Sequence, residues 1–350
     1  MLMSLKKGKI KNNSQLCILI AIFFGFFVLM SVLMPGTFLR LGTMQSMMVQ
    51  LPEFGIYALA MMFAMILGGI DLSIVSIGNL SSIIASQFML RYMIANAGGT
   101  ENLRVVVQGI CIALAVGALC GIFNGVSVAV VGIPPMLATL ASMSIFNGIS
   151  TVLTKGASLQ GLPEEYALIG KSTLFGIIPI IIVIFLLAAC IAYVIQKRTK
   201  LGMKMFLVGS NARAAQFSGI NNHFVIITAY LLSGVLSSIA GIIMTSRSMS
   251  SKMDYGLIYQ LQAILAVVLG GVSPKGGIGS VGGVVMAVLS LQVLSTGLNI
   301  LNLASTSYVK NLIWGLFLVV VLLMNYYADT KKRKGKFEKT KIVITKNKTH

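Results

Sequence analysis

The sequence consists largely of apolar runs close to the length that crosses a bilayer as a helix, which is roughly 20 residues. Ten runs are near this length, although the eighth is short and the second and fourth are long enough to tilt or break. They cover residues 16–34, 46–69, 73–90, 105–131, 136–153, 174–195, 223–244, 258–272, 281–301 and 308–326. The predicted fold class is an all-α integral membrane protein of about ten transmembrane helices.

The composition agrees with a membrane location. Of the 350 residues, 57% are hydrophobic and only 10% are charged, whereas an ordinary soluble domain has roughly 25% charged residues. Four lysines precede the first apolar run, as in a signal peptide, but the run is long and no A-x-A cleavage site follows it. We therefore interpret this run as a retained first helix.

The positions of the basic residues predict the orientation, because cytoplasmic loops are enriched in Lys and Arg. With the N-terminus in the cytoplasm, the inner segments hold 19 of the 27 basic residues and the outer segments hold 8. Both termini are then cytoplasmic. Residues 1–330 are predicted to form the transmembrane domain and residues 331–350 a basic cytoplasmic tail. The net charge of +19 needs no nucleic-acid partner, although the tail can also be attracted to anionic lipid.

Residues that commonly bind metals or act as nucleophiles give no recognisable site. The four cysteines all lie inside apolar runs, without a C-x-x-C pair or neighbouring histidines, at Cys17, Cys111, Cys120 and Cys190. The two histidines are His223, at the start of a run, and His350, at the end of the chain. We therefore expect no metal, no cofactor and no catalytic residue.

Two segments resemble nucleotide-binding motifs without having the necessary context. GGIGSVGG contains a G-x-G-x-x-G at Gly277, Gly279 and Gly282, but it joins two predicted membrane helices instead of a strand and a helix. IGKST at 169–173 ends like a phosphate-binding loop, yet Glu165 stands where its first glycine is needed. Any ATP hydrolysis is therefore expected in a separate subunit.

Small and polar residues inside the runs suggest how the helices pack. Gly117, Gly121 and Gly125 recur every fourth residue, so one helix face lets another helix approach closely. Asp71 follows Gly68 and Gly69, which can end one helix, and has the placement of an N-cap of the next. The alternative is an ion or proton relay, because an intramembrane acid is a functional candidate. A relay needs partners, and no second acid or base lies at comparable depth.

The cytoplasmic segment 197–224 contains a short helical pattern. Ser210 or Asn211 can cap a helix over residues 212–217, and Gly219 can end it in a left-handed conformation. A helix this short is not stable alone in water. It must pack on the membrane domain itself or dock into a soluble partner.

Five motifs follow one another along the chain: GGIDLSIVSIGNLS at 68–81, NGVSVAVVGIPPMLATLASMSIFNG at 124–148, VGSNARAAQFSGI at 208–220, AVVLGGVSPKGGIGSVGG at 266–283 and GLNIL at 297–301. In this order they resemble the permease subunit of bacterial ATP-binding-cassette (ABC) sugar importers of the ribose, xylose and galactose type. The resemblance implies a multi-pass protein of the bacterial plasma membrane that translocates a monosaccharide or similar neutral polyol. It also implies three protein partners: a cytoplasmic ABC ATPase, an extracytoplasmic sugar-binding protein and a second permease chain.

The resemblance further implies that the loop at about 197–222 carries the coupling helix, which inserts into a groove of the ATPase. The residues assigned to this contact are Gly209, Asn211, Ala214, Ala215, Phe217, Ser218 and Gly219. The sequence departs from the family pattern at Ser210, Ala141 and Asn147. The last of these places an amide where the family often has arginine, so nucleosides, branched-chain amino acids and a sugar-derived signal stay open as substrates.

Amide side chains in the predicted spans are candidates for the translocation path, because they suit a neutral polyol better than an ion. They are Asn79, Asn124, Asn147, Gln262 and Asn299. An ion-coupled secondary transporter is the main alternative and would need an ion site at mid-membrane, for which only Asp71 is available. A membrane-embedded enzyme would need a nucleophile with a base, and the sequence shows neither.

Overall fold

The computed structural model describes residues 2–94, 101–300 and 312–323, and side chains from residue 16 onward. The chain divides into two compact units, residues 1–303 and 304–350. The described part of the second unit is one apolar helix, Leu312–Leu323. The predicted tail at 331–350 lies outside the described residues.

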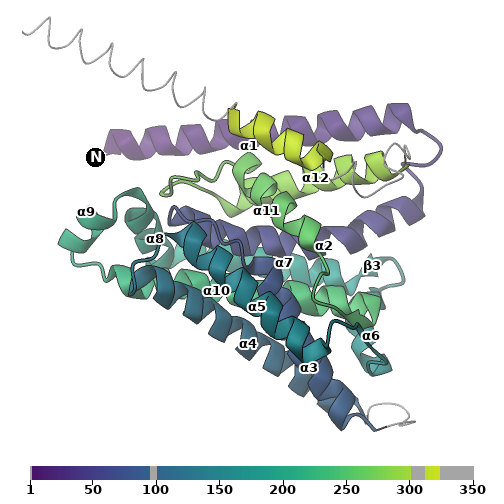
Figure 1. Cartoon of the computed structure of the whole chain (residues 1–350). Coiled ribbons are helices and arrows are strands. Elements are labelled where there is room, and N and C mark those ends of the chain that lie inside the picture. The colour runs from purple at the N-terminus through teal and green to yellow at the C-terminus, as the bar shows by residue number, and fades with distance from the viewer. Residues whose placement is uncertain (1, 95–100, 301–311, 324–350) are drawn as a thin grey trace, which may run out of the picture. The chain divides into compact units, whose positions relative to one another are not determined.

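The described part of the first unit is almost entirely helical (Figure 1). Its helices are α1 (Leu2–Leu33), α2 (Leu41–Ile66), α3 (Ile74–Tyr92), α4 (Leu103–Ala129), α5 (Pro135–Thr154), α6 (Glu164–Lys171), α7 (Ile180–Arg198), α8 (Lys200–Ser210), α9 (Ala212–Phe217), α10 (Asn222–Ser248), α11 (Leu257–Leu269) and α12 (Val281–Ile300). Two short antiparallel strand pairs are also present: β1 (Leu159–Gln160) pairs with β4 (Ser250–Ser251), far apart in the sequence, and β2 (Thr173–Leu174) forms a hairpin with β3 (Ile178–Pro179).

Seven of the described helices are long and apolar enough to cross a membrane: α1 over residues 16–33, α2, α4, α5, α7, α10 and α12. The 19-residue α3 is long enough, but its serines and amides make it less apolar. The 13-residue α11 and the helix 312–323 are shorter. The all-α membrane fold is thus confirmed, while ten spans and the sidedness of the termini stay predictions. One boundary was wrong, because residues 173–179 form the β2–β3 hairpin and α7 begins only at Ile180.

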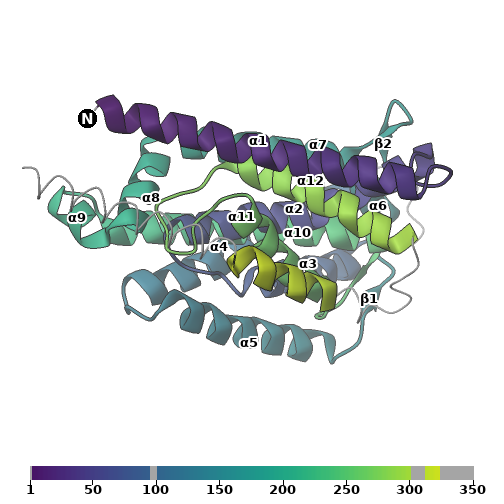
Figure 2. The ribbon, with the colours of Figure 1, turned by 90° about the horizontal axis from the view of Figure 1, so that it is seen from above.

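Helix α2 is the centre of the first unit. Every residue from Leu51 to Ile66 is buried, and α2 contacts α10, α11, α12 and α7. Figure 2 shows α1 running alongside α12, where Met30 and Phe38 pack around Val293. A helix surrounded on all sides is expected to be apolar on every face, and in this buried run Glu53 is the one charged exception.

The glycine face of α4 packs directly against α10, as predicted. A Cβ added to Gly117 would lie 2.6 Å from the carbonyl oxygen of Gly234, and one added to Gly125 would lie 2.7 Å from Cα of Ile227. Real Cβ atoms essentially never come this close, so only glycine permits this separation of the two helices. Close backbone approach supplies the van der Waals contact that holds helices together in lipid.

Candidate coupling and translocation elements

The predicted coupling helix is α9, and its bounds match the sequence prediction. Asn211 separates α8 from α9, and its side chain accepts a hydrogen bond from the Ala214 amide at 3.0 Å. Gly219 has φ +77° and ends the helix in the left-handed region, where a Cβ costs energy. The hydroxyl of Ser218 donates to the Ala214 carbonyl. The capping chemistry of Asn211 and Gly219 therefore explains why this helix has two turns and no more.

Helix α9 lies at one end of the bundle and presents an apolar residue there. Both views place it at the same end as the start of α1, with the β2–β3 hairpin at the opposite end (Figures 1 and 2). Phe217 is 93% exposed, whereas Ala215 is buried and Gly209 is half-buried. Asn211, Ala214, Ser218 and Gly219 are exposed. Nδ2 of Asn222 donates to the Ala212 carbonyl at 2.8 Å, which ties α9 to the start of α10.

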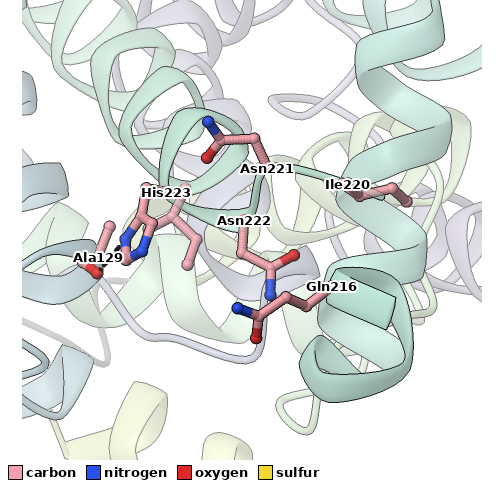
Figure 3. A pocket seen from close by; sticks show the side chains of 7 residues that line it. Ala129, Gln216, Ile220, Asn221, Asn222 and His223 are labelled. Atoms are coloured by element: carbon pink, nitrogen blue, oxygen red, sulfur yellow. Dashed lines mark hydrogen bonds between the residues drawn. The ribbon is translucent and has the colours of Figure 1, made fainter. Parts of the chain in front are cut away.

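A cavity of about 420 Å³ opens beside α9, where α10 begins and α4 ends (Figure 3). Its lining residues are Ala129, Gln216, Ile220, Asn221, Asn222, His223 and Ile226. The ring of His223 hydrogen-bonds through Nδ1 to the Ala129 carbonyl at the end of α4. The cavity therefore flanks the exposed side of α9 with amide groups and apolar carbons.

The five predicted path residues do not share one set of contacts. Nδ2 of Asn79 donates to the carbonyls of Met253 and Tyr255, at 2.7 and 2.9 Å. Nδ2 of Asn124 donates to the Ser73 hydroxyl at 2.7 Å. The other three are Asn147, half-buried on α5, Gln262, buried on α11, and Asn299, exposed on α12. Asn79 and Asn124 therefore have structural partners, and the path assignment stays a prediction for all five.

Asp71 is fully buried between α2 and α3 and accepts three hydrogen bonds. Oδ1 accepts from the amide of Ser73 at 3.0 Å and from its hydroxyl at 2.6 Å, and Oδ2 accepts from the Ser233 hydroxyl at 2.9 Å. The N-cap position of α3 is Ser73, so the predicted cap at Asp71 is displaced by two residues. The carboxylate instead closes the turn that precedes the helix, because Leu72 and Ser73 are not yet helical, and links that turn to α10.

One ionic contact was not anticipated from the sequence. Nε of Arg247, at the end of α10, lies 2.7 Å from Oε1 of Glu53 on α2, and Nη2 donates to Oε2 at 3.2 Å. The hydroxyl of Tyr259 on α11 donates to the same Oε2 at 2.5 Å. Three helices thus meet at one carboxylate. With the N-terminus in the cytoplasm, Glu53 lies near the outer end of the predicted run 46–69 and Arg247 just beyond the outer end of the run 223–244. That shared depth was the available signal.

Comparison with known proteins places these elements in a family. Residues 43–323 match the family described as "Branched-chain amino acid transport system / permease component". The chain is similar to the ribose import permease protein RbsC of Bacillus subtilis (strain 168), with 33% identity over 87% of this chain and 91% of the relative. It is similar to the D-allose transport system permease protein AlsC of Escherichia coli (strain K12), with 30% identity over 88% and 89%.

A third relative is the autoinducer 2 import system permease protein LsrD of Yersinia pseudotuberculosis serotype O:3 (strain YPIII), with 29% identity over 77% of this chain and 78% of the relative. No solved structure matches the chain. The matched region runs from α2 to the end of the described residues and includes α8 and α9. The chain belongs to this family of permease components and is a multi-pass transport protein of the bacterial cell membrane, not a catalytic enzyme.

Proposed function

We propose that the chain is the membrane-spanning permease of an ABC importer and translocates a monosaccharide or similar small neutral polyol. The relatives named for ribose and D-allose import support this substrate class. The relative named for autoinducer 2 import keeps a sugar-derived signal as the second candidate. The observation that carries the proposal is α9, a capped two-turn helix that exposes Phe217 at one end of the bundle.

The mechanism follows from a division of labour between subunits. A cytoplasmic ABC ATPase binds α9 and hydrolyses ATP, an extracytoplasmic binding protein delivers the substrate, and a second permease chain completes the path. Substrate selection in the binding protein allows the permease lining to bind weakly, since a tight intermediate site would slow release. Scattered neutral amides such as Asn147 and Gln262 are compatible with such a lining. Residues 1–330 form the permease domain in this proposal, and residues 331–350 a basic cytoplasmic tail.

We predict that Phe217→Asp weakens binding of the ATPase by about thirtyfold or more, because an aromatic anchor at an interface contributes roughly 2 kcal/mol or more. Membrane abundance should stay near normal, since the 93% exposed side chain has little contact with the fold. The measurement is a pull-down of the ATPase subunit beside a membrane-abundance blot.

The matched control for Phe217 is Phe175→Asp, because Phe175 is 90% exposed in the β2–β3 hairpin at the opposite end of the bundle. This variant should keep full ATPase binding. If Phe217→Asp also kept full binding and full ATP hydrolysis, α9 would not be the coupling element.

The proposed topology has ten spans, including α3, α11 and helix 312–323, with both termini cytoplasmic. In a cysteine-free parent, we expect a cysteine at Gln160 to react with an impermeant thiol reagent from outside, because Gln160 is exposed in β1. A cysteine at Ser218, beside Phe217, should react only after lysis, and so should one at Lys336.

Ser251 is the control for accessibility. Ser251 lies in β4 and pairs with Leu159, the neighbour of Gln160 in β1. Because Ser251 is fully buried, a cysteine there should react slowly even though it lies on the same side of the membrane. Labelling of Ser218 in intact cells would put α9 on the wrong side for an ATPase and reject the topology.

A further inference from the structure

Three chain segments meet backbone to backbone directly beside the coupling helix. The amide of Gly277, in the α11–α12 linker, donates to the carbonyl of Ile66 at the end of α2 at 2.8 Å. Gly209, near the end of α8, lies against both groups. A Cβ added to Gly209 would be 2.8 Å from the Gly277 nitrogen and closer still to the Ile66 oxygen.

The α11–α12 linker and the chain just after α2 are also packed closely at this contact. A Cβ added to Gly276 would lie 2.6 Å from the carbonyl oxygen of Gly209, and one added to Gly277 would lie 2.8 Å from Cα of Ser210. One added to Gly68 would lie 3.2 Å from the carbonyl oxygen of Lys275. We call this contact the glycine junction, and it comprises Ile66, Gly68, Gly209, Gly276 and Gly277.

The glycine junction is joined to α9 without a flexible linker. Only Ser210 and the capping residue Asn211 separate Gly209 from the first residue of α9. On its other side, Ile66 ends the fully buried run of α2. The linker residues Gly276 and Gly277 lead into α12, whose first residue Val281 donates its amide to Oε1 of Gln196 on α7.

Backbone contacts of this kind transmit displacement differently from side-chain contacts. Side chains at a helix interface can change rotamer and absorb a shift, whereas packed backbone can move only as a body or by breaking the contact. A displacement of α9 therefore reaches α2 and the α11–α12 linker through Gly209.

We propose that the glycine junction transmits the movement of α9 to α2 and α12 during transport, and that Gly209 is the positioning residue of this step. The inference rests on the proposed function, because it assumes that an ATPase moves α9. It adds the route by which that movement enters the buried core of the permease.

The test is Gly209→Ala in the complete transporter, reconstituted with its ATPase and binding protein. A methyl group at Gly209 must separate α8 from Ile66 or Gly277. We expect substrate uptake per copy of the transporter to fall by about tenfold or more. This is the usual size of the effect when the coupling between two sites of a protein is lost. The ATPase should still copurify in normal amount, and ATP hydrolysis should lose its stimulation by the loaded binding protein.

The matched control is Gly148→Ala on α5, where a Cβ meets nothing within 4 Å. This variant should transport normally. If the ATPase does not copurify with the unmodified chain, the proposed function fails. If it copurifies and Gly209→Ala transports at the unmodified rate, only the glycine junction fails.

A measurement on the unmodified complex covers the case in which Gly209→Ala does not fold. Hydrogen exchange is followed with and without a non-hydrolysable ATP analogue on peptides that contain α9, residues 66–70 and residues 273–280. We expect all three peptides to change protection together. A change confined to α9 would overturn the proposal.

Discussion

Replacing Arg247 with methionine is expected to destabilise the protein by about 3–5 kcal/mol, the usual result of leaving a buried charge without its partner. Its partner, Glu53, has a side chain that is only 1% exposed, whereas that of Arg247 is 36% exposed. Without Arg247, the carboxylate would keep only the hydroxyl of Tyr259 as a described partner. The melting temperature of the detergent-solubilised protein measures the loss, which should be among the largest for any single substitution outside the apolar core.

Two further variants show whether the lost stability comes from charge. Adding Glu53→Gln to Arg247→Met should recover part of the melting temperature, because the neutral amide costs less to leave unpaired than the carboxylate. Lys252→Met is the surface control. Lys252 also pairs with an acid, Asp254, but both side chains are well exposed at 38% and 44%, so this change should cost at most about 1 kcal/mol. A double variant less stable than Arg247→Met would contradict the ionic explanation.

Asp71→Ala should cost about 3 kcal/mol or more, because it leaves the buried Ser73 amide and the Ser233 hydroxyl without their acceptor. This exceeds the roughly 0.5–2 kcal/mol expected of an N-cap alone. Asp71→Asn should retain appreciable transport, since Oδ1 can still accept from Ser73 and a hydroxyl such as that of Ser233 can also accept from an amide. The measurements are folded yield and uptake per copy.

Ser233→Ala is the graded control for the Asp71 variants, because it removes one of the three hydrogen bonds and should cost about 1 kcal/mol. The outcome also decides between the structural and relay interpretations of Asp71. An Asn variant with normal abundance and no uptake would favour an ionisable role, as in an ion-coupled transporter.

Features set by local sequence were predictable. The bounds of α9 follow from Asn211 and Gly219, whose side chain and backbone conformation act within a few residues. The close face of α4 follows from glycines spaced every fourth residue. The start of α7 was misplaced because residues 174–178 are apolar, and hydropathy alone does not distinguish a hairpin from the first turn of a membrane helix.

The translocation path illustrates the opposite case. Asn79 and Asn124 were selected because amides are rare in apolar spans, but an amide can serve a substrate or a neighbouring backbone equally well. The partner of Asn79 is a carbonyl 174 residues away in the sequence, and nothing near position 79 specifies that distance. Its structural use could therefore be recognised only from the fold.

The sequence by itself determined that the chain is an all-α membrane protein of a permease family, because length, hydropathy and short motifs are read along the chain. Only the tertiary structure decided that Glu53 meets Arg247, 194 residues later, and that Gly209 meets Ile66 and Gly277. The physical reason is that lipid tails are as apolar as the side chains on the helix surfaces, so hydropathy does not determine which helices pack against each other. That choice depends on shape and on a few polar contacts, which exist only once the helices are packed.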